Sequence, residues 1–296
     1  MDENQSELTR MNVQEPSSRP GVKPDIPQGK STLEEKKVPE FTIKNIQQFI
    51  NLIEEFVTQG FSFFRGDKNC INYELVPNLF KKKNCSLIDH QETMINDFTF
   101  LSIGRNSSPT NGPFEEMLNA QHYELPTRLL DWTESALIAL YFSVYNDHDT
   151  TREDSIVWAL NPAGINSHIG FMSDIYHKGA LYVGASYDSL DEELSTYYNS
   201  PNISELYPVA VKTRRINPRI DAQRGVFLIY CKNSDTKCLT KYNDANKFLR
   251  KICIKKEDAS KIQKQLESVG MTQYSLFPEM KSIAEDIVKR YKGGVK

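Results

Sequence analysis

Apolar residues recur every three or four positions where the ordered part of the chain begins, near Phe41. From Ile43 to Phe56 this spacing predicts an amphipathic helix, which Gly60 is expected to end. The same helical spacing is found over residues 86–103, 114–122, 135–145, 257–269 and 279–291.

Short apolar runs between these helices predict β-strands, which cover residues 61–67, 155–160, 207–212, 225–230 and 251–254. Leu129–Leu130 is expected to be a further short extended piece, because Pro126 disfavours a helix there. Residues 163–205 are polar and irregular, which predicts an inserted loop or lid. The elements follow no regular strand–helix–strand rhythm, so the pattern favours the α+β class over a doubly wound sheet.

Composition separates a tail from the rest of the chain. Residues 1–38 are rich in Pro, Ser, Gln, Glu and Lys, so we predict a disordered N-terminal tail that is dispensable for folding. Residues 39–296 have room for one large domain. The sequence shows no run that could span a membrane and no secretory signal, and its five cysteines are scattered. We therefore expect a cytoplasmic protein with reduced thiols.

Charge is unevenly distributed along the chain. The whole sequence has 36 Lys and Arg against 39 Asp and Glu, a net charge of −3. Residues 241–296 have 13 Lys and Arg against 7 Asp and Glu, a net charge of +6. Such a basic C-terminal helical region could contact RNA, DNA or an acidic partner, although lysines along helices are more often only solvated.

The first candidate for chemistry is FFRG, residues 63–66. Arg65 would present its guanidinium at the end of a buried strand. The N–H donors of a guanidinium lie in one plane, which favours hydrogen bonds to phosphate groups. Gly66 would let a ligand approach the backbone. The structural alternative is an ion pair between Arg65 and a carboxylate such as Glu92.

The second candidate is QHYELPTRLLDWTESALIALYF, residues 121–142. His122 has an ordinary pKa near neutrality and could act as an acid or base. The structural alternatives are that His122 only ends a helix, that Arg128 pairs with Asp131, and that Thr133 caps the next helix.

The third candidate comes just before the predicted strand 225–230 and contains Arg219, Gln223 and Arg224. A polar side chain and Gly225 at a strand start fit the edge of a cleft, and a β-bulge would explain them equally well. The sequence has no P-loop, hydrolase-elbow, zincin or EF-hand motif, and its histidines are too dispersed for a local metal cluster.

These motifs resemble the FRG domain family, which is named for a Phe-x-Arg-Gly motif. Residues 63–66 match that motif, and residues 121–133 match a QHYGLPTRLLDWT-type string, with Glu124 where the family usually has Gly. Gln223, Gly225 and Phe227 match a Gln-x-Gly-x-Phe motif, and residues 276–279 match a late Leu-Phe-Pro-acidic motif. The resemblance spans about residues 41–290, and many family members occur in bacterial or phage-defence contexts.

A more distant resemblance is to ADP-ribosyltransferases. These enzymes have Arg-Gly or His-Gly at the end of their first core strand, and a second strand that ends in Thr or Ser, similar to Thr133. A later strand usually presents a catalytic Glu, where this chain has Gln223. The resemblance implies a split mixed β-sheet with flanking helices, an ADP-ribosyltransferase-like core, with NAD as co-substrate bound across the split.

The same resemblance implies roles for individual residues. Asp131 would stabilise the positive charge that develops on the ribose, and Gln223 would hydrogen-bond the ribose hydroxyls. His122 and Arg128 would position or protonate the reacting groups. The residues expected to bind NAD are Arg65, Gly66, Tyr73, Tyr123, Arg128, Trp132 and Thr133.

The implied function is that of an NAD-dependent ADP-ribosyltransferase that acts as a toxin or anti-phage defence effector. Its acceptor would be nucleic acid (RNA) or a translation-related protein, and an antitoxin or inhibitor protein would be a further partner; no membrane is implied. One alternative is a module that binds a nucleotide-like signal without chemistry and docks a partner. A nuclease that uses His122 and Asp131 is the less favoured alternative, because no carboxylates occur in pairs with metal-binding spacing.

Overall fold

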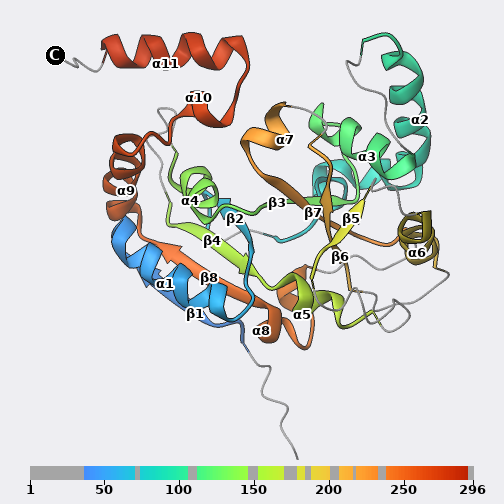
Figure 1. Cartoon of the computed structure of the whole chain (residues 1–296), viewed down its shortest axis with the longest axis horizontal. Helices are drawn as coiled ribbons and strands as arrows, with labels where there is room; N and C mark the ends of the chain where they lie inside the picture. Colours follow the sequence, from blue (N-terminus) through green and yellow to red (C-terminus); the bar gives the residue numbers. More distant parts are fainter. Residues whose placement is uncertain are drawn as a thin grey trace, which may run out of the picture. The chain divides into compact units, whose positions relative to one another are not determined.

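Strands from all parts of the chain meet in one mixed β-sheet (Figure 1). The computed structural model describes residues 37–70, 74–105, 112–145, 153–169, 179–183, 188–200, 207–215, 218–232 and 238–292. The predicted tail, residues 1–38, lies outside the described residues except for its last two positions. Residues 36–296 form one compact unit.

The described part of the sheet has eight strands in the order β1-β8-β4-β2-β3-β7-β6-β5. The pairs β1–β8 and β5–β6 are parallel, and all other neighbours are antiparallel. The strands are β1 (Glu40–Ile43), β2 (Phe63–Asp67), β3 (Leu129–Thr133), β4 (Ser155–Leu160), β5 (Leu181–Val183), β6 (Val209–Thr213), β7 (Gly225–Ile229) and β8 (Leu249–Ile254).

The sheet is split between β2 and β3. These two strands share a single residue pair, Phe64 with Thr133, whereas β2 pairs with β4, and β3 with β7, over five positions each. We call β1, β8, β4 and β2 the first half-sheet, and β3, β7, β6 and β5 the second half-sheet. The predicted α+β class with a split mixed sheet is confirmed. The ADP-ribosyltransferase-like core stays a prediction.

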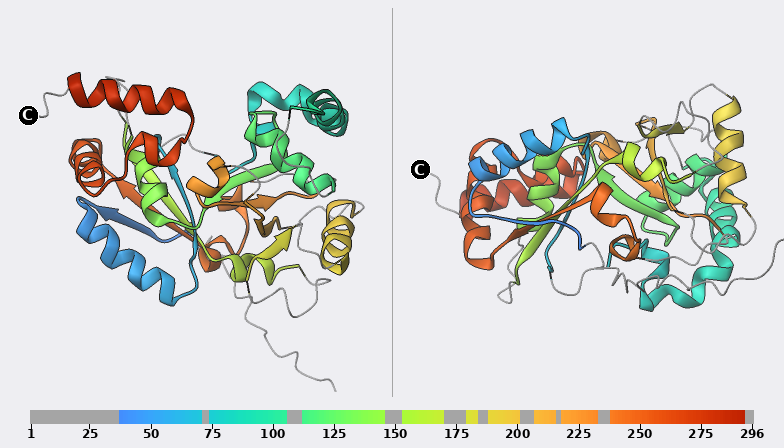
Figure 2. Two further views of the ribbon diagram at one scale, coloured as in Figure 1. Left: turned by 45° about the horizontal axis from the view of Figure 1, so that its top comes forward. Right: turned by 90° about the horizontal axis from the view of Figure 1, so that it is seen from below.

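Three helices cover one face of the first half-sheet: α1 (Ile46–Thr58), α4 (Ala136–Val144) and α9 (Lys256–Ser268). The side chain of Asn45 begins α1 by accepting a hydrogen bond from the Gln48 N–H, and Gly60, with a φ of 86°, follows its end as expected. Apolar residues of these helices and strands form the first cluster, which includes Phe49, Phe64 and Ile252. Figure 2 shows α1 and α9 together over β1 and β8, away from α2 and α6.

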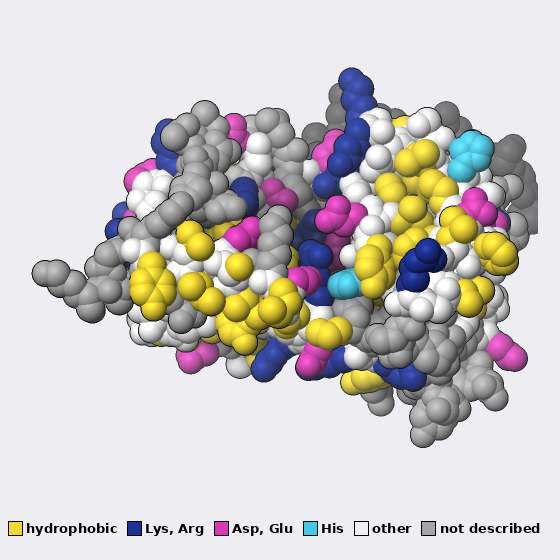
Figure 3. Space-filling model, turned by 90° about the horizontal axis from the view of Figure 1, so that it is seen from above, with side chains coloured by type: hydrophobic (Ala, Val, Ile, Leu, Met, Phe, Trp, Pro, Cys, Tyr) yellow, Lys and Arg dark blue, Asp and Glu magenta, His cyan; other side chains and the backbone are white. Residues whose placement is uncertain are grey.

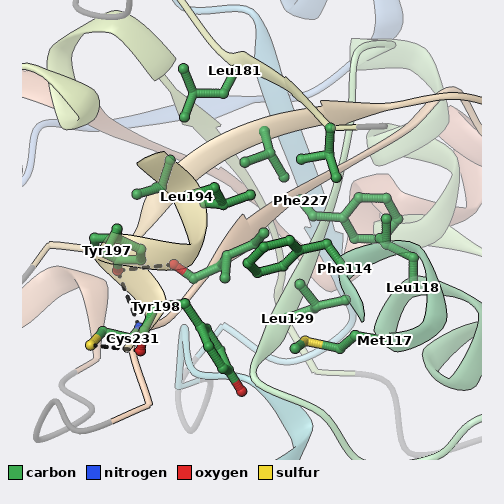
Figure 4. Close-up of a cluster of buried hydrophobic side chains, with 14 of the residues drawn as sticks. Phe114, Met117, Leu118, Leu129, Leu181, Leu194, Tyr197, Tyr198, Phe227 and Cys231 are labelled. Atoms are coloured by element: carbon green, nitrogen blue, oxygen red, sulfur yellow. Dashed lines mark hydrogen bonds between the residues drawn. The ribbon is translucent and has the colours of Figure 1, made fainter. Parts of the chain in front are cut away.

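The same face of the second half-sheet is covered by α2 (Gln91–Ser102), α3 (Pro113–His122) and α6 (Asp188–Tyr198). Figure 4 shows their shared core, in which Leu118 of α3 lies near Phe227 of β7, and Phe114 of α3 packs against Tyr198 of α6 with ring centres 5.7 Å apart. We call it the second cluster. The short helix α7 (Pro218–Ala222) joins this cluster through Ile220.

The opposite face of the sheet carries one cluster that crosses the split. This third cluster joins Phe63 of β2 and Trp158 of β4 to Leu130 of β3 and Leu228 of β7. It is covered by α8 (Ala245–Phe248), by Ile165 of α5 (Pro162–Asn166) and by the 3₁₀ turn Leu239–Lys241. The two half-sheets therefore share one core behind the split and have separate cores in front of it.

The C-terminal helices α10 (Gln273–Leu276) and α11 (Met280–Lys292) follow α9 and lie beside α4 and α9 rather than over the second half-sheet (Figure 1). Across the residues that the structure describes, no helix has the length and apolar character needed to cross a membrane.

Three predictions about elements were wrong. Residues 40–43 form β1 before the helix begins, because they pair in parallel with β8. Residues 163–205 are not irregular throughout, since α5, β5 and α6 lie within them. Residues 86–90 belong to a 3₁₀ helix, Lys82–His90, so that α2 begins only at Gln91. The other predicted helices and strands are present with shifted ends.

Candidate functional site

A pocket of about 730 Å³ opens where β2 and β3 diverge. It lies between the first and second clusters, since its walls include Phe142 of α4 on one side, and Leu118 and Phe227 on the other. Figure 3 shows a hollow in this face of the molecule, with acidic, basic and histidine side chains in and around it. The volume falls in the range of about 300–1,000 Å³ that is usual for small-molecule sites.

Arg65 of β2 reaches across the split to β3. Its Nη1 donates a hydrogen bond of 2.5 Å to the backbone carbonyl of Asp131, and lies 3.9 Å from the Asp131 carboxylate. The strands stop pairing at this point, so the guanidinium replaces the strand neighbour that the carbonyl would otherwise have. The predicted structural alternative, an ion pair of Arg65 with a carboxylate, is found with Asp131 and not with Glu92, because Glu92 pairs with Lys232 at 2.6 Å.

The Asp131 carboxylate is held by a short chain of hydrogen bonds. Gln121 Nε2 donates to Asp131 Oδ1 at 2.7 Å, and the Thr127 hydroxyl donates to Gln121 Oε1. Because Thr127 occupies the amide oxygen of Gln121, the amide nitrogen must face Asp131. Sequence reasoning assigned no role to Gln121. Gln121 is the first residue of the motif at 121–133, and this position could have indicated a role in the site.

His122, the last residue of α3, lines the same pocket. Burial lowers the pKa of its imidazole below the ordinary value, and the positive charge of Arg219 lowers that pKa further, while Glu279 opposes the shift. His122 is therefore neutral at pH 7 and able to accept a proton.

Asp67, at the end of β2, is a second acidic residue of the pocket that sequence reasoning missed. Burial raises the pKa of its carboxyl, although the N–H of Asn69 and the charges of Arg65 and Lys81 pull in the opposite direction. Burial and the nearby Arg65 in turn lower the pKa of Lys81. A carboxyl with a raised pKa in a pocket is a frequent property of functional sites.

Gly66 lines the pocket, but its small size serves packing. A Cβ atom built on Gly66 would lie 1.8 Å from the carbonyl oxygen of Ala139 and 2.8 Å from the backbone nitrogen of Ser143, both in α4. The missing side chain thus lets α4 lie directly on β2. The expectation that Gly66 admits a ligand is replaced by this structural role.

Thr133 is the last residue of β3, and its hydroxyl group makes two hydrogen bonds beside the pocket. Its hydroxyl donates to the carbonyl of Gln223 at 2.7 Å and accepts from the N–H of Ser135. Ser135, rather than Thr133, caps α4, because its side chain accepts from the Ile138 N–H. Thr133 lines the pocket as expected, and the prediction that it caps the helix is wrong.

Gln223 also lines the pocket, and its side chain is anchored. Nε2 of Gln223 donates to the carbonyl of Leu276 at 3.2 Å. The next residue, Phe277, packs between the guanidinium of Arg219, 5.1 Å from its ring centre, and the ring of Phe142 at 5.8 Å. The Leu-Phe-Pro-Glu segment at 276–279 therefore joins α4 of the first half-sheet to α7 of the second.

Three predicted site residues lie elsewhere. Arg128 is buried, stacks on Phe80 at 4.8 Å and donates to the Cys231 carbonyl, so it neither lines the pocket nor pairs with Asp131. Tyr123 is 57% exposed, packs against Phe98 and His122, and is not among the lining residues. Tyr73 lies outside the described residues.

Trp132 reaches the pocket wall, but its indole is 4% exposed and belongs to the third cluster behind the sheet. Residues alternate between the two faces of a strand, so Trp132 and Asp131 point to opposite sides of β3. The burial of this ring disfavours the expected role of Trp132 in binding NAD. Within the described ranges, no group of three His, Cys, Asp or Glu side chains is placed to hold a metal ion.

The family model of the FRG domain matches residues 61–152. This chain contains an FRG domain. The matched segment supplies Arg65, Gln121, His122 and Asp131, so most of the polar pocket belongs to the FRG domain itself, while Gln223 comes from the part of the chain that follows. Comparisons with curated proteins and with solved structures gave no match.

Proposed function

We propose that the pocket of the FRG domain binds NAD and that the protein is an NAD-dependent ADP-ribosyltransferase. The observation that supports this most is the pairing of Arg65 with Asp131 across the split, which puts a cation that suits phosphate beside an oriented carboxylate. The pocket volume of about 730 Å³ is sufficient for a dinucleotide.

The side chains fit the charges of such a substrate. Arg65 and Arg219 offer guanidinium groups to the pyrophosphate, and the carboxylate of Asp131 faces the positive charge that builds on the ribose. In the transfer, the bond between ribose C1′ and nicotinamide breaks and its electron pair leaves with nicotinamide. An oxygen or nitrogen of the acceptor bonds to C1′, and neutral His122 takes the proton that the acceptor gives up.

A test of the proposal measures NAD binding and transfer of labelled ADP-ribose separately. Asp131→Asn keeps the size of the side chain and its bond from Gln121 but removes the charge, so it should bind NAD and lose transfer by about 100-fold or more. Asp97→Asn is the matched control, because Asp97 is exposed on α2. Full transfer by Asp131→Asn would contradict the assigned role, and absence of NAD binding by the unmodified protein would overturn the proposal.

Arg65→Lys tests the binding half of the proposal. Lys keeps the charge but loses the planar fork, so NAD affinity should fall about tenfold while the melting temperature changes little. An equal loss of affinity and of stability would assign Arg65 to the scaffold alone.

The second candidate function is a module that binds a nucleotide without chemistry. It is favoured by Gln223, which stands where ADP-ribosyltransferases usually have Glu and which uses its amide to hold the Leu276 carbonyl. NAD binding together with intact NAD after prolonged incubation with RNA and protein acceptors would favour this function.

We further propose that the protein acts in the cytoplasm as a toxin or defence effector. Expression should then arrest growth, and Asp131→Asn should relieve the arrest. An inhibitor protein that covers the pocket would be the expected partner.

A further inference from the structure

Among the described residues, some lysines form an ion pair with a carboxylate and others, such as Lys44 and Lys241, do not. Five lysines away from the pocket form ion pairs of 2.6–3.0 Å with carboxylates: Lys212, Lys232, Lys247, Lys251 and Lys255. Four lysines in the pocket or next to its lining residues in the chain, which we call the lysine group, form no ion pair with any residue that the structure describes. They are Lys68, Lys81, Lys82 and Lys83.

The lysine group surrounds the end of β2. Lys68 and Lys83 line the pocket, and Lys81 feels the positive charges of Arg65 and Lys83 as well as the negative charges of Asp67 and Asp131. Lys82 is exposed and is not among the lining residues, so the group continues from the pocket onto the surface. Like charges gathered in this way repel one another, and an anion that binds among them removes the repulsion.

The surface around the lysine group favours a nucleic acid over a protein partner. Protein interfaces have an apolar core, whereas interfaces with nucleic acids are polar and strongly positive. From Glu74 to His90, all of which the structure describes, no large apolar side chain is exposed. Leu75, Val76 and Leu79 of this segment are all buried.

We propose that the lysine group holds the phosphodiester backbone of a single-stranded nucleic acid, and that this strand is the acceptor presented to the pocket. The transfer of ADP-ribose to this strand rests on the proposed function, whereas the binding of the strand by the lysine group does not. A single strand is required because a base in a duplex is stacked and paired, and must leave the duplex to enter a pocket. The pyrophosphate of NAD would use the arginines, which leaves the lysines for the second substrate.

The experiment measures binding of a fluorescent RNA of about 12 nucleotides, a length within the usual range for single-strand sites, in the absence of NAD. Lys82→Glu and Lys81→Glu should each weaken binding at least tenfold. Each should also reduce the slope of log Kd against log salt concentration by about 0.7, the value for one lost contact to a single strand. Lys44→Glu is the matched control, because Lys44 is exposed and follows β1, the edge strand that β8 and β4 separate from β2.

The outcomes separate this inference from the proposed function. Unchanged RNA binding by Lys81→Glu and Lys82→Glu overturns the lysine group as the binding surface, and equal binding of a duplex overturns the requirement for a single strand. Competition by polyglutamate as strong as by RNA would assign the surface to an acidic protein. Transfer of ADP-ribose to protein without RNA binding overturns the inference and leaves the proposed function in place. If the protein binds RNA through the lysine group but does not bind NAD, the proposed function is overturned and the binding step of the inference stays in place.

Discussion

The two half-sheets are stabilised by different kinds of contact. The first cluster depends on apolar helices that lie close to the strands, and the absent side chain of Gly66 lets α4 touch β2. The second cluster is also apolar, but paired polar groups are buried beside it as well. Glu115, with no exposed surface, accepts two hydrogen bonds from Arg214, and Gln91 donates to the Tyr198 hydroxyl at 2.7 Å.

The pocket takes residues from both halves, and the difference between them explains its chemistry. The first half-sheet contributes the end of β2 with Arg65 and Asp67, while the second contributes a polar wall with Asp131, His122 and Gln223. A shared core behind the split keeps the halves together, so the front can remain open without separating them. Changes in the two halves should therefore have different signatures.

The largest effect is expected for Gly66→Ala, which tests close packing in the first half-sheet. The added methyl group would meet the backbone of α4 at 1.8 Å, so the helix must move, at a cost of about 3 kcal/mol or more of unfolding free energy. Gly179→Ala is the control, because a Cβ atom there meets nothing within 4 Å. Chemical denaturation of both variants measures the difference. A Gly66→Ala protein as stable as the control would show that α4 is not held in this way.

The next effect is expected for Arg214→Ala in the second half-sheet. It leaves the Glu115 carboxylate buried without its partner, and we expect a loss of about 2–3 kcal/mol, below the value for a fully buried pair because Arg214 is 47% exposed. Arg215→Ala removes an exposed pair with Asp221 and should cost less than about 1 kcal/mol. Equal losses in the two variants would remove the contrast between buried polar pairs and surface pairs.

Asp67→Asn is expected to change the unfolding free energy less, and to increase it rather than lower it. Burial raises the pKa of folded Asp67 above its ordinary 3.8, so the unfolded chain loses this proton first as pH rises, and the wild type loses stability above about pH 4. Asn does not ionise and so causes no such loss of stability. The variant should therefore be more stable than the wild type at pH 7 and nearly equal to it in stability at pH 3. Melting curves at several pH values measure the difference. A variant destabilised at pH 7 would mean that the charge of Asp67 supports the fold.

The smallest effect is expected for His122→Gln. Burial lowers the pKa of folded His122 below 6.5, so the unfolded chain takes up this proton first as pH falls, and the wild type loses stability below about pH 6.5. The variant should lose less stability between pH 7 and pH 5 than the wild type does. Parallel curves for the two proteins would show that the ring is protonated equally in both states.

Local periodicity predicted most of the helices, because helical residues three and four apart share a face whatever surrounds them. It could not predict β1, since four residues show no reliable period and their pairing with β8 joins positions more than 200 residues apart. Arg65, His122, Arg128 and Asp131 were predicted to line one cleft; the structure brings Arg65, His122 and Asp131 to one pocket, whereas Arg128 is buried outside it. Their resemblance to family motifs, rather than any spacing, carried that prediction.

The errors at the site have a common physical cause. Sequence reasoning recognised only Leu129–Leu130 as extended, so the alternation along the full strand could not be applied. Knowing that β3 runs to Thr133 would have placed Trp132 on the opposite face from Asp131. Gly66 illustrates a different limit, because its contact with Ala139 depends on how α4 returns across the sheet, which no local pattern encodes.

The position of β8 between β1 and β4 has a consequence for protein synthesis. The second half-sheet is complete once residue 229 has been translated, whereas the first half-sheet needs residues 249–254 to join its earliest strand to the rest. Such long-range pairing is slow to form and comes late in synthesis. The segment at 276–279 that anchors Gln223 comes later still. The contact that anchors Gln223 in the pocket therefore forms only after residues 276–279 have been translated, about 50 residues after the last lining residue, Phe227.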